Sequence, residues 1–159
     1  MRKVLLLLSL AFIVSCSSVD CPVKNWVRCY YNVYDSEGAL LQLQDTLTIY
    51  TKRKNRTDTI LLNSGIGLKA FDLPVSYTQP EDTLFFHFYK DDYDVTDTVW
   101  IKKDDYPHFE SMECKVDYFH QLTGVRYTTH AIDSLVLKNP NVNYEDQTIN
   151  FFIYPDSSR

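Results

Sequence analysis

Apolar and polar residues alternate in short segments, separated by turn-forming residues, from residue 26 onward. In the first segment Val27, Cys29 and Val33 share one face, as every second residue of an extended strand does. No segment of ten or more residues has the spacing of an amphipathic helix. About eight short strands with turns roughly every 8–12 residues predict an all-β chain, folded as an antiparallel immunoglobulin-like β-sandwich.

Segments with this strand-like pattern cover residues 26–34, 46–51, 59–62, 68–73, 83–89, 98–102, 112–118, 125–129, 134–137 and 149–154. The most regular of them is 112–118, in which Met112, Cys114 and Val116 alternate with charged residues. Thr123-Gly124 is predicted to be the turn between this strand and the next.

The first fifteen residues have the composition of a secretory signal. Arg2 and Lys3 give a basic start, and the apolar run that follows is too short to cross a membrane as a helix. The segment Ile13-Val14-Ser15-Cys16 resembles the lipobox of bacterial lipoproteins, whose cysteine is acylated and becomes the first residue after cleavage. We therefore expect a lipoprotein signal peptide at 1–15, a lipidated tether at 16–24 anchored through Cys16, a β-sandwich domain at 25–155 and a tail at 156–159.

Charge argues against nucleic acid as a partner. Cleavage before Cys16 would leave 144 residues with 14 basic and 21 acidic side chains, a net charge of −7. Nucleic acids and anionic lipid headgroups are bound by basic patches, which an acidic chain disfavours. The densest basic run, residues 52–56, lies between two predicted strands and is expected to be a solvated hairpin tip.

Three cysteines remain besides Cys16, and an exported chain is expected to form one disulfide from them. Their spacing matches no zinc or redox motif. The phase of the alternation places Cys29 and Cys114 on apolar faces and suggests that these two pair. A bond between Cys21 and Cys114 would instead fasten the tether to the domain, so both pairings stay open.

One tripeptide recurs five times, with an acid followed by a hydroxyl residue and an aliphatic residue. The hydroxyl residues are Thr46, Thr59, Thr83, Thr98 and Ser134. Mechanically, the Asp would close a turn and the β-branched residue would open a strand. The pattern also resembles the O-glycosylation acceptor of Bacteroidota envelope proteins, which makes these five residues candidate glycosylation sites.

Neither metal binding nor catalysis is expected. If Thr123-Gly124 is a turn, His120 and His130 lie ~10 Å apart along the strands, and two ligands of one zinc ion must lie much closer. His108 is expected to be an ordinary strand residue as well. The acids between Asp91 and Asp97 lack the glycine of a calcium loop and should form a solvated hairpin. The chain has no nucleophile elbow and no phosphate-binding glycine loop, so we expect no enzyme and no cofactor.

Aromatic residues are abundant, with twelve Tyr, nine Phe and two Trp, and most must fill the core of the sandwich. Trp26, Tyr30 and Tyr34 share the face opposite Cys29. If they are exposed, they form a stripe suited to stacking on sugars or packing against a partner protein; the alternative is that a neighbouring strand covers them.

Segments along nearly the whole mature chain resemble an uncharacterised family, a domain of unknown function, of small Bacteroidota outer-membrane lipoproteins. The resembling segments are Cys16 with Asp20-Cys21, residues 73–77, 107–111, Glu113-Cys114, Gly124-Val125, 130–134 and 139–144. The resemblance implies a disulfide between Cys21 and Cys114, with Cys29 as the odd thiol. It also implies an outer-membrane β-barrel protein as a partner, and it brings no catalytic residue.

We therefore expect a non-enzymatic β-sandwich held at the outer membrane by its lipid, which acts as an interaction or assembly module. Acylation confines a protein to the membrane surface and raises its effective concentration near membrane partners. The alternative expectation is a surface lipoprotein that binds glycans through Trp26, Tyr30 and Tyr34.

Overall fold

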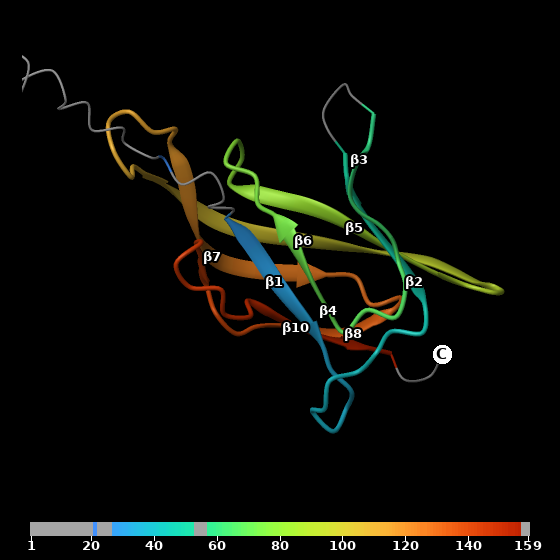
Figure 1. Cartoon of the computed structure of the whole chain (residues 1–159). Coiled ribbons are helices and arrows are strands. Elements are labelled where there is room, and N and C mark those ends of the chain that lie inside the picture. Colours follow the sequence, from blue (N-terminus) through green and yellow to red (C-terminus); the bar gives the residue numbers. More distant parts are fainter. Residues whose placement is uncertain (1–20, 22–26, 53–56, 157–159) are drawn as a thin grey trace, which may run out of the picture.

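The computed structural model describes residues 21, 27–52 and 57–156, and over these residues the chain is built from strands without a helix. The strands are β1 (Arg28–Val33), β2 (Thr46–Thr51), β3 (Thr59–Gly65), β4 (Ala70–Pro74), β5 (Glu81–Lys90), β6 (Tyr93–His108), β7 (Asp117–Tyr127), β8 (Ile132–Leu137), β9 (Asn141–Val142) and β10 (Phe151–Pro155). They form a four-stranded sheet of order β4-β1-β10-β8 and a six-stranded sheet of order β3-β2-β5-β6-β7-β9 (Figure 1).

Nearly all strand pairs are antiparallel. Strands β5, β6 and β7 form a meander of long hairpins at the centre of the six-stranded sheet. The exception is the parallel pair of β1 with β10, in which Tyr31 lies opposite Phe151. The first and last strands of the domain therefore lie side by side in the middle of the four-stranded sheet.

The core lies between the two sheets and follows from the alternation seen in the sequence. Cys29, Tyr31 and Val33 of β1 are buried, while the residues between them are partly exposed. The Tyr31 ring stacks within its own sheet on Phe71, at 4.9 Å, and meets the edge of Phe86 from the other sheet at 6.2 Å between ring centroids. Apolar contacts of this kind across two sheets are the main stabilising force of a sandwich. The predicted all-β sandwich class is confirmed, with ten strands rather than about eight.

The region from 112 to 127 differs from the sequence prediction. Met112 and Cys114 lie in the loop between β6 and β7, and β7 begins only at Asp117. The predicted turn at Thr123-Gly124 is wrong, because these residues lie inside β7. Lys102 pairs with Gly124 but Lys103 pairs with Leu122, so Thr123 is the extra residue of a β-bulge. The first error arose because the alternation of apolar and polar residues continues through a loop. The second arose because a glycine beside a β-bulge resembles a glycine in a turn.

In the part of the chain that the structure describes, no helix is long and apolar enough to cross a membrane.

Candidate functional site

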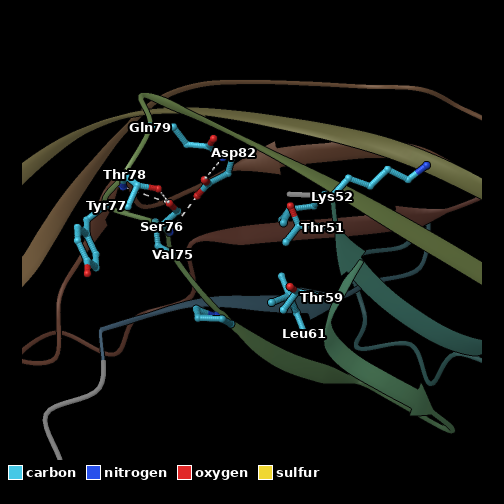
Figure 2. A pocket seen from close by; sticks show the side chains of 12 residues that line it. Thr51, Lys52, Thr59, Leu61, Val75, Ser76, Tyr77, Thr78, Gln79 and Asp82 are labelled. Carbon is cyan, nitrogen blue, oxygen red and sulfur yellow. Dashed lines mark hydrogen bonds between the residues drawn. The ribbon is translucent and has the colours of Figure 1, made fainter. Parts of the chain in front are cut away.

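A pocket of about 590 Å³ opens at one end of the sandwich, beside the loop that joins β4 to β5. Figure 2 shows this loop facing the ends of β2 and β3. The pocket is lined by Thr51, Lys52, Thr59, Leu61, Pro74, Val75, Ser76, Tyr77, Thr78, Gln79, Asp82 and Leu84. The lining combines hydroxyl groups, one amide and the charged side chains of Lys52 and Asp82 with aliphatic residues, a composition that suits a polar ligand.

Asp82 is the buried acid of this pocket. Its carboxylate accepts hydrogen bonds from the backbone N–H of Ser76, at 3.1 Å, and from Nε2 of Gln79, at 3.2 Å. Burial raises the pKa of Asp82, although these two hydrogen bonds and the positive charge of Lys103 act in the opposite direction. The carboxylate is fixed to the β4–β5 loop, so that it shapes the pocket wall (Figure 2).

Behind Asp82 lies a buried ionic cluster. The side chain of Lys103 is fully buried, and its Nζ donates to the carbonyl of Gln79 at 2.8 Å and to both oxygens of Asp105 at 2.9 and 3.1 Å. Nδ1 of His120 lies 2.6 Å from Asp105. Burial lowers the pKa of His120, which the hydrogen bond with Asp105 only partly offsets. Lys103 thus ties the β4–β5 loop to β6 and fixes the rear of the pocket.

Tyr77 supplies an aromatic surface at the edge of the pocket. One face of its ring stacks on Tyr118, with centroids 4.6 Å apart and planes 4° apart. The residue is still 59% exposed. An aromatic face beside hydroxyls and a fixed carboxylate is the combination that binds a sugar ring, because the ring stacks and its hydroxyl groups find donors and acceptors.

We expect Asp82→Asn to leave the folded protein at least as stable as the wild type at pH 7. Because burial raises the pKa of Asp82, its stabilising contribution is present below the unfolded pKa and is lost as the pH rises through the folded one. Asparagine keeps the shape without the buried charge: its amide oxygen can accept from the Ser76 N–H, and its amide nitrogen can donate to the side-chain oxygen of Gln79 once that amide is turned over. In urea unfolding, the variant should therefore have a free energy of unfolding at least equal to that of the wild type at pH 7, and any difference between the two should shrink at pH 4. A variant clearly less stable than the wild type at pH 7 would contradict this expectation.

Sequence reasoning missed Asp82, Lys103 and Asp105 as site residues, although a signal was present. Asp82 is in phase with the buried Leu84 of β5, and Lys103 with the buried Ile101 of β6. A charged residue that continues an inward-facing apolar row indicates either the end of the core or a buried charge.

His108, His120 and His130, three of the four histidines, each have a different partner in the structure. His120 pairs with Asp105, because the strand register differs from that assumed with a turn at Thr123-Gly124. His130 hydrogen-bonds to Asp97, and His108 stacks on Phe119 at 4.2 Å. Among the described residues, no group of three or more His, Cys, Asp or Glu side chains could hold a metal ion.

The acids expected in a solvated hairpin divide into two groups. Asp91 and Asp92 are exposed in the turn between β5 and β6, and Asp94 pairs with His87 at 2.7 Å. Asp97 is fully buried, which corrects the prediction for this residue. It faces inward from β6 and takes hydrogen bonds from the segment that follows β7.

The five candidate O-glycosylation residues occupy different places in their strands. Thr46 and Thr59 begin β2 and β3, as predicted if the Asp of the tripeptide closes a turn and the β-branched residue opens a strand. Thr83, Thr98 and Ser134 lie inside β5, β6 and β8. All five are partly exposed. At Asp82 and Asp97 the acid of the tripeptide is a buried residue, so there the pattern reflects an inward-facing carboxylate rather than a turn.

Two of the three candidate binding aromatics lie on the outer face of the four-stranded sheet; Trp26 lies outside the described residues. Tyr30 and Tyr34 are partly buried. The ring of Tyr34 contacts Phe152 at 4.4 Å and Tyr154 at 6.1 Å. We call Tyr34, Phe152 and Tyr154, together with the exposed Val136 opposite Phe152, the aromatic face. These aromatic side chains come from β10 and from the residue that follows β1.

The cysteine pairing is the one that the family resemblance implies. Cys21 and Cys114 form a disulfide, with their Cα atoms 5.5 Å apart. Cys29 is buried in the core, and its burial raises the pKa of the thiol to about 12. The phase of Cys114 was misleading because this residue belongs to a loop. Cys16, the residue expected to be lipidated, lies outside the described residues.

Comparison with known proteins gives one match. The model of a protein family described as a family of unknown function (DUF6452) matches residues 30–155. No curated protein and no solved structure matches the chain.

Proposed function

The chain belongs to this family of unknown function, and we propose that it is a lipid-anchored, non-enzymatic binding module of the bacterial cell envelope. Its signal-like first fifteen residues and the lipobox-like segment ending at Cys16 support export and acylation. The partner that we propose is an outer-membrane protein, a β-barrel by the family resemblance.

The disulfide between Cys21 and Cys114 is the observation that carries this proposal. Stable disulfides form in exported proteins and are rare in the reducing cytoplasm. This one joins two residues 93 positions apart and begins five residues after Cys16. It fits a protein that is exported first and then attached to a membrane by its N-terminal cysteine.

The aromatic face supports a binding role. Phe152 contacts the Tyr34 ring, and Nζ of Lys138 lies 5.2 Å from the Phe152 centroid. Val136, next to it on β8, is 39% exposed. Tyrosine and phenylalanine are enriched in the buried centres of protein interfaces, so this face is suited to a protein partner.

The first experiment tests the anchor and the partner separately. Membrane fractions should retain the wild type and lose Cys16→Ala. Pull-down of the lipidated protein in detergent should recover an outer-membrane protein, and Val136→Asp should abolish this recovery. Ile60→Asp is the matched control, because Ile60 is an exposed aliphatic residue of β3 in the other sheet. Retention of Cys16→Ala, or recovery of nothing specific, would refute the corresponding part of the proposal.

Glycan binding is the second candidate function, and the pocket beside Tyr77 favours it. Tyr30 and Tyr34 are only partly exposed, whereas Tyr77 is 59% exposed and lies in the same loop as the hydroxyls of Ser76 and Thr78. A saccharide would stack on Tyr77 and place its hydroxyl groups toward Asp82.

On a glycan array, wild type and Tyr89→Ala should then bind the same saccharides, while Tyr77→Ala binds them between about twofold and tenfold more weakly. Tyr89 is a suitable control because it is exposed near the other end of the β5–β6 hairpin. An array without hits, or equal binding by both variants, would exclude this function.

A further inference from the structure

The tip of the β6–β7 hairpin carries exposed apolar side chains. Phe109 is 62% exposed and Met112 is completely exposed, although both are large hydrophobic residues. The hairpin projects from the body of the sandwich (Figure 1). Exposed apolar residues at the end of a projecting element are typical of a contact surface rather than of a core.

The disulfide joins this tip to the N-terminal part of the chain. Cys114 lies two residues after Met112, and its partner Cys21 lies five residues after Cys16. Five residues span at most roughly 18 Å when fully extended. Without the disulfide, the domain would be linked to its anchor only through the longer chain segment between Cys16 and β1. That segment would allow the domain to lie much farther from the membrane.

We propose that Phe109 and Met112 insert into the interfacial layer of the same bilayer that holds the acyl chains of Cys16. The inference rests on the proposed lipid anchor and adds a second point of membrane contact, which fixes the orientation of the domain. Acidic Glu110 and Glu113 flank the two apolar residues, so the surface they meet is one of zwitterionic rather than anionic lipid.

The orientation of the whole sandwich follows. Strand β6 runs for 16 residues from Tyr93 to His108, a length on the order of 50 Å. Its C-terminal end would lie at the membrane, and the exposed acidic turn at Asp91 and Asp92 would point away from it. Two contacts, one covalent and one apolar, restrict rotation in a way that a single acyl anchor does not.

Fluorescence in vesicles tests this contact. The lipidated full chain is reconstituted in phosphatidylcholine vesicles containing brominated acyl chains, with Phe109→Trp or Met112→Trp as reporters. Tyr89→Trp is the control, because Tyr89 is equally an exposed residue but pairs with Asp94, at the other end of β6. Trp26 and Trp100 contribute the same background to all three variants. We expect the added tryptophan to be quenched and shifted to shorter wavelength at 109 and 112 but not at 89.

Two readouts separate the possible failures. Sedimentation of the vesicles shows whether the chain is anchored at all, and a protein left in the supernatant refutes the proposed function. A protein that sediments but shows no more quenching at 109 and 112 than at 89 refutes only the hairpin contact. Because both reporter positions are exposed in a loop, far-UV spectra and unfolding midpoints should match those of the wild type.

Discussion

Asp97→Asn is expected to lower the free energy of unfolding at pH 7 by about 3 kcal/mol or more, the largest effect of any single substitution considered for this domain. Asp97 is fully buried and accepts hydrogen bonds from five donors. They are the Thr128 hydroxyl at 2.6 Å, the backbone N–H groups of His130, Ala131 and Ile132 at 2.8, 2.7 and 2.8 Å, and Nδ1 of His130 at 3.0 Å.

The position of these donors explains why the loss is large. They belong to the segment that leaves β7 in one sheet and enters β8 in the other, so Asp97 holds the crossing between the two sheets. An asparagine has the same shape, but its amide nitrogen would face N–H donors in place of a carboxylate oxygen. Buried donors without an acceptor cost far more than a hydrogen bond lost at the surface.

Asp97 also makes the free energy of unfolding depend on pH in the acidic range. Burial would raise the pKa of Asp97, but the hydrogen bonds from His130, Thr128, Ala131 and Ile132 outweigh it and lower the pKa. A carboxyl whose pKa is lower in the folded state contributes stability above its unfolded pKa and loses it as the pH falls through the folded value. The wild type should therefore lose stability below about pH 4, while Asp97→Asn should show a weaker dependence there.

Urea unfolding of Asp97→Asn and Asp82→Asn at pH 7 provides the comparison. Both are buried acids of β-strands in the same Asp-Thr-aliphatic tripeptide, yet their pKa values shift in opposite directions. Equal unfolding midpoints for the two variants would show that the hydrogen bonds to Asp97 do not stabilise the fold in this way.

This contrast also marks the limit of sequence reasoning for the chain. The alternation in the sequence was sufficient for the β-sandwich class and for the inward face of β1, where Cys29 and Val33 are buried as expected. It could not distinguish Asp82 from Asp97. The donors to Asp97 lie 31 to 35 residues farther along the chain, whereas those to Asp82 lie 3 and 6 residues before it, in the β4–β5 loop. No local pattern shows which of these donors the fold brings to each carboxylate. Strand order is non-local for the same reason: β1 pairs with β10 across some 120 residues.

The errors in the hairpin region have a local cause. Apolar and charged residues alternate in 112–118 as regularly as in a strand, but β6 ends at His108 and β7 begins only at Asp117. The loop between these strands is held by the disulfide. Period two indicates which residues can share a face, not which segments find a partner strand. The pocket was missed because its residues come from β2, β3, β4, β5 and the segments that follow β2 and β4, which no local pattern connects.

Removing the disulfide with the double substitution Cys21→Ser and Cys114→Ser is expected to lower the free energy of unfolding by about 2 to 4 kcal/mol. The bond closes a loop with a sequence separation of 93, for which the chain-entropy model gives about 4 to 5 kcal/mol. Part of this is lost, because releasing Cys21 also frees the N-terminal segment in the folded protein. The core is not expected to change, since Cys114 lies in a loop outside it.

Equilibrium urea unfolding, with and without reductant, checks this expectation. The reduced wild type should match the double variant, because Cys29 is buried and takes no part in the bond. Cys29→Ala is the matched control and should remain sensitive to reductant. If reductant leaves the wild-type midpoint unchanged, the bond does not constrain the unfolded chain. In vesicles, the double variant should stay anchored while tryptophan at 112 loses its quenching, because only the bond keeps the hairpin tip near the anchor.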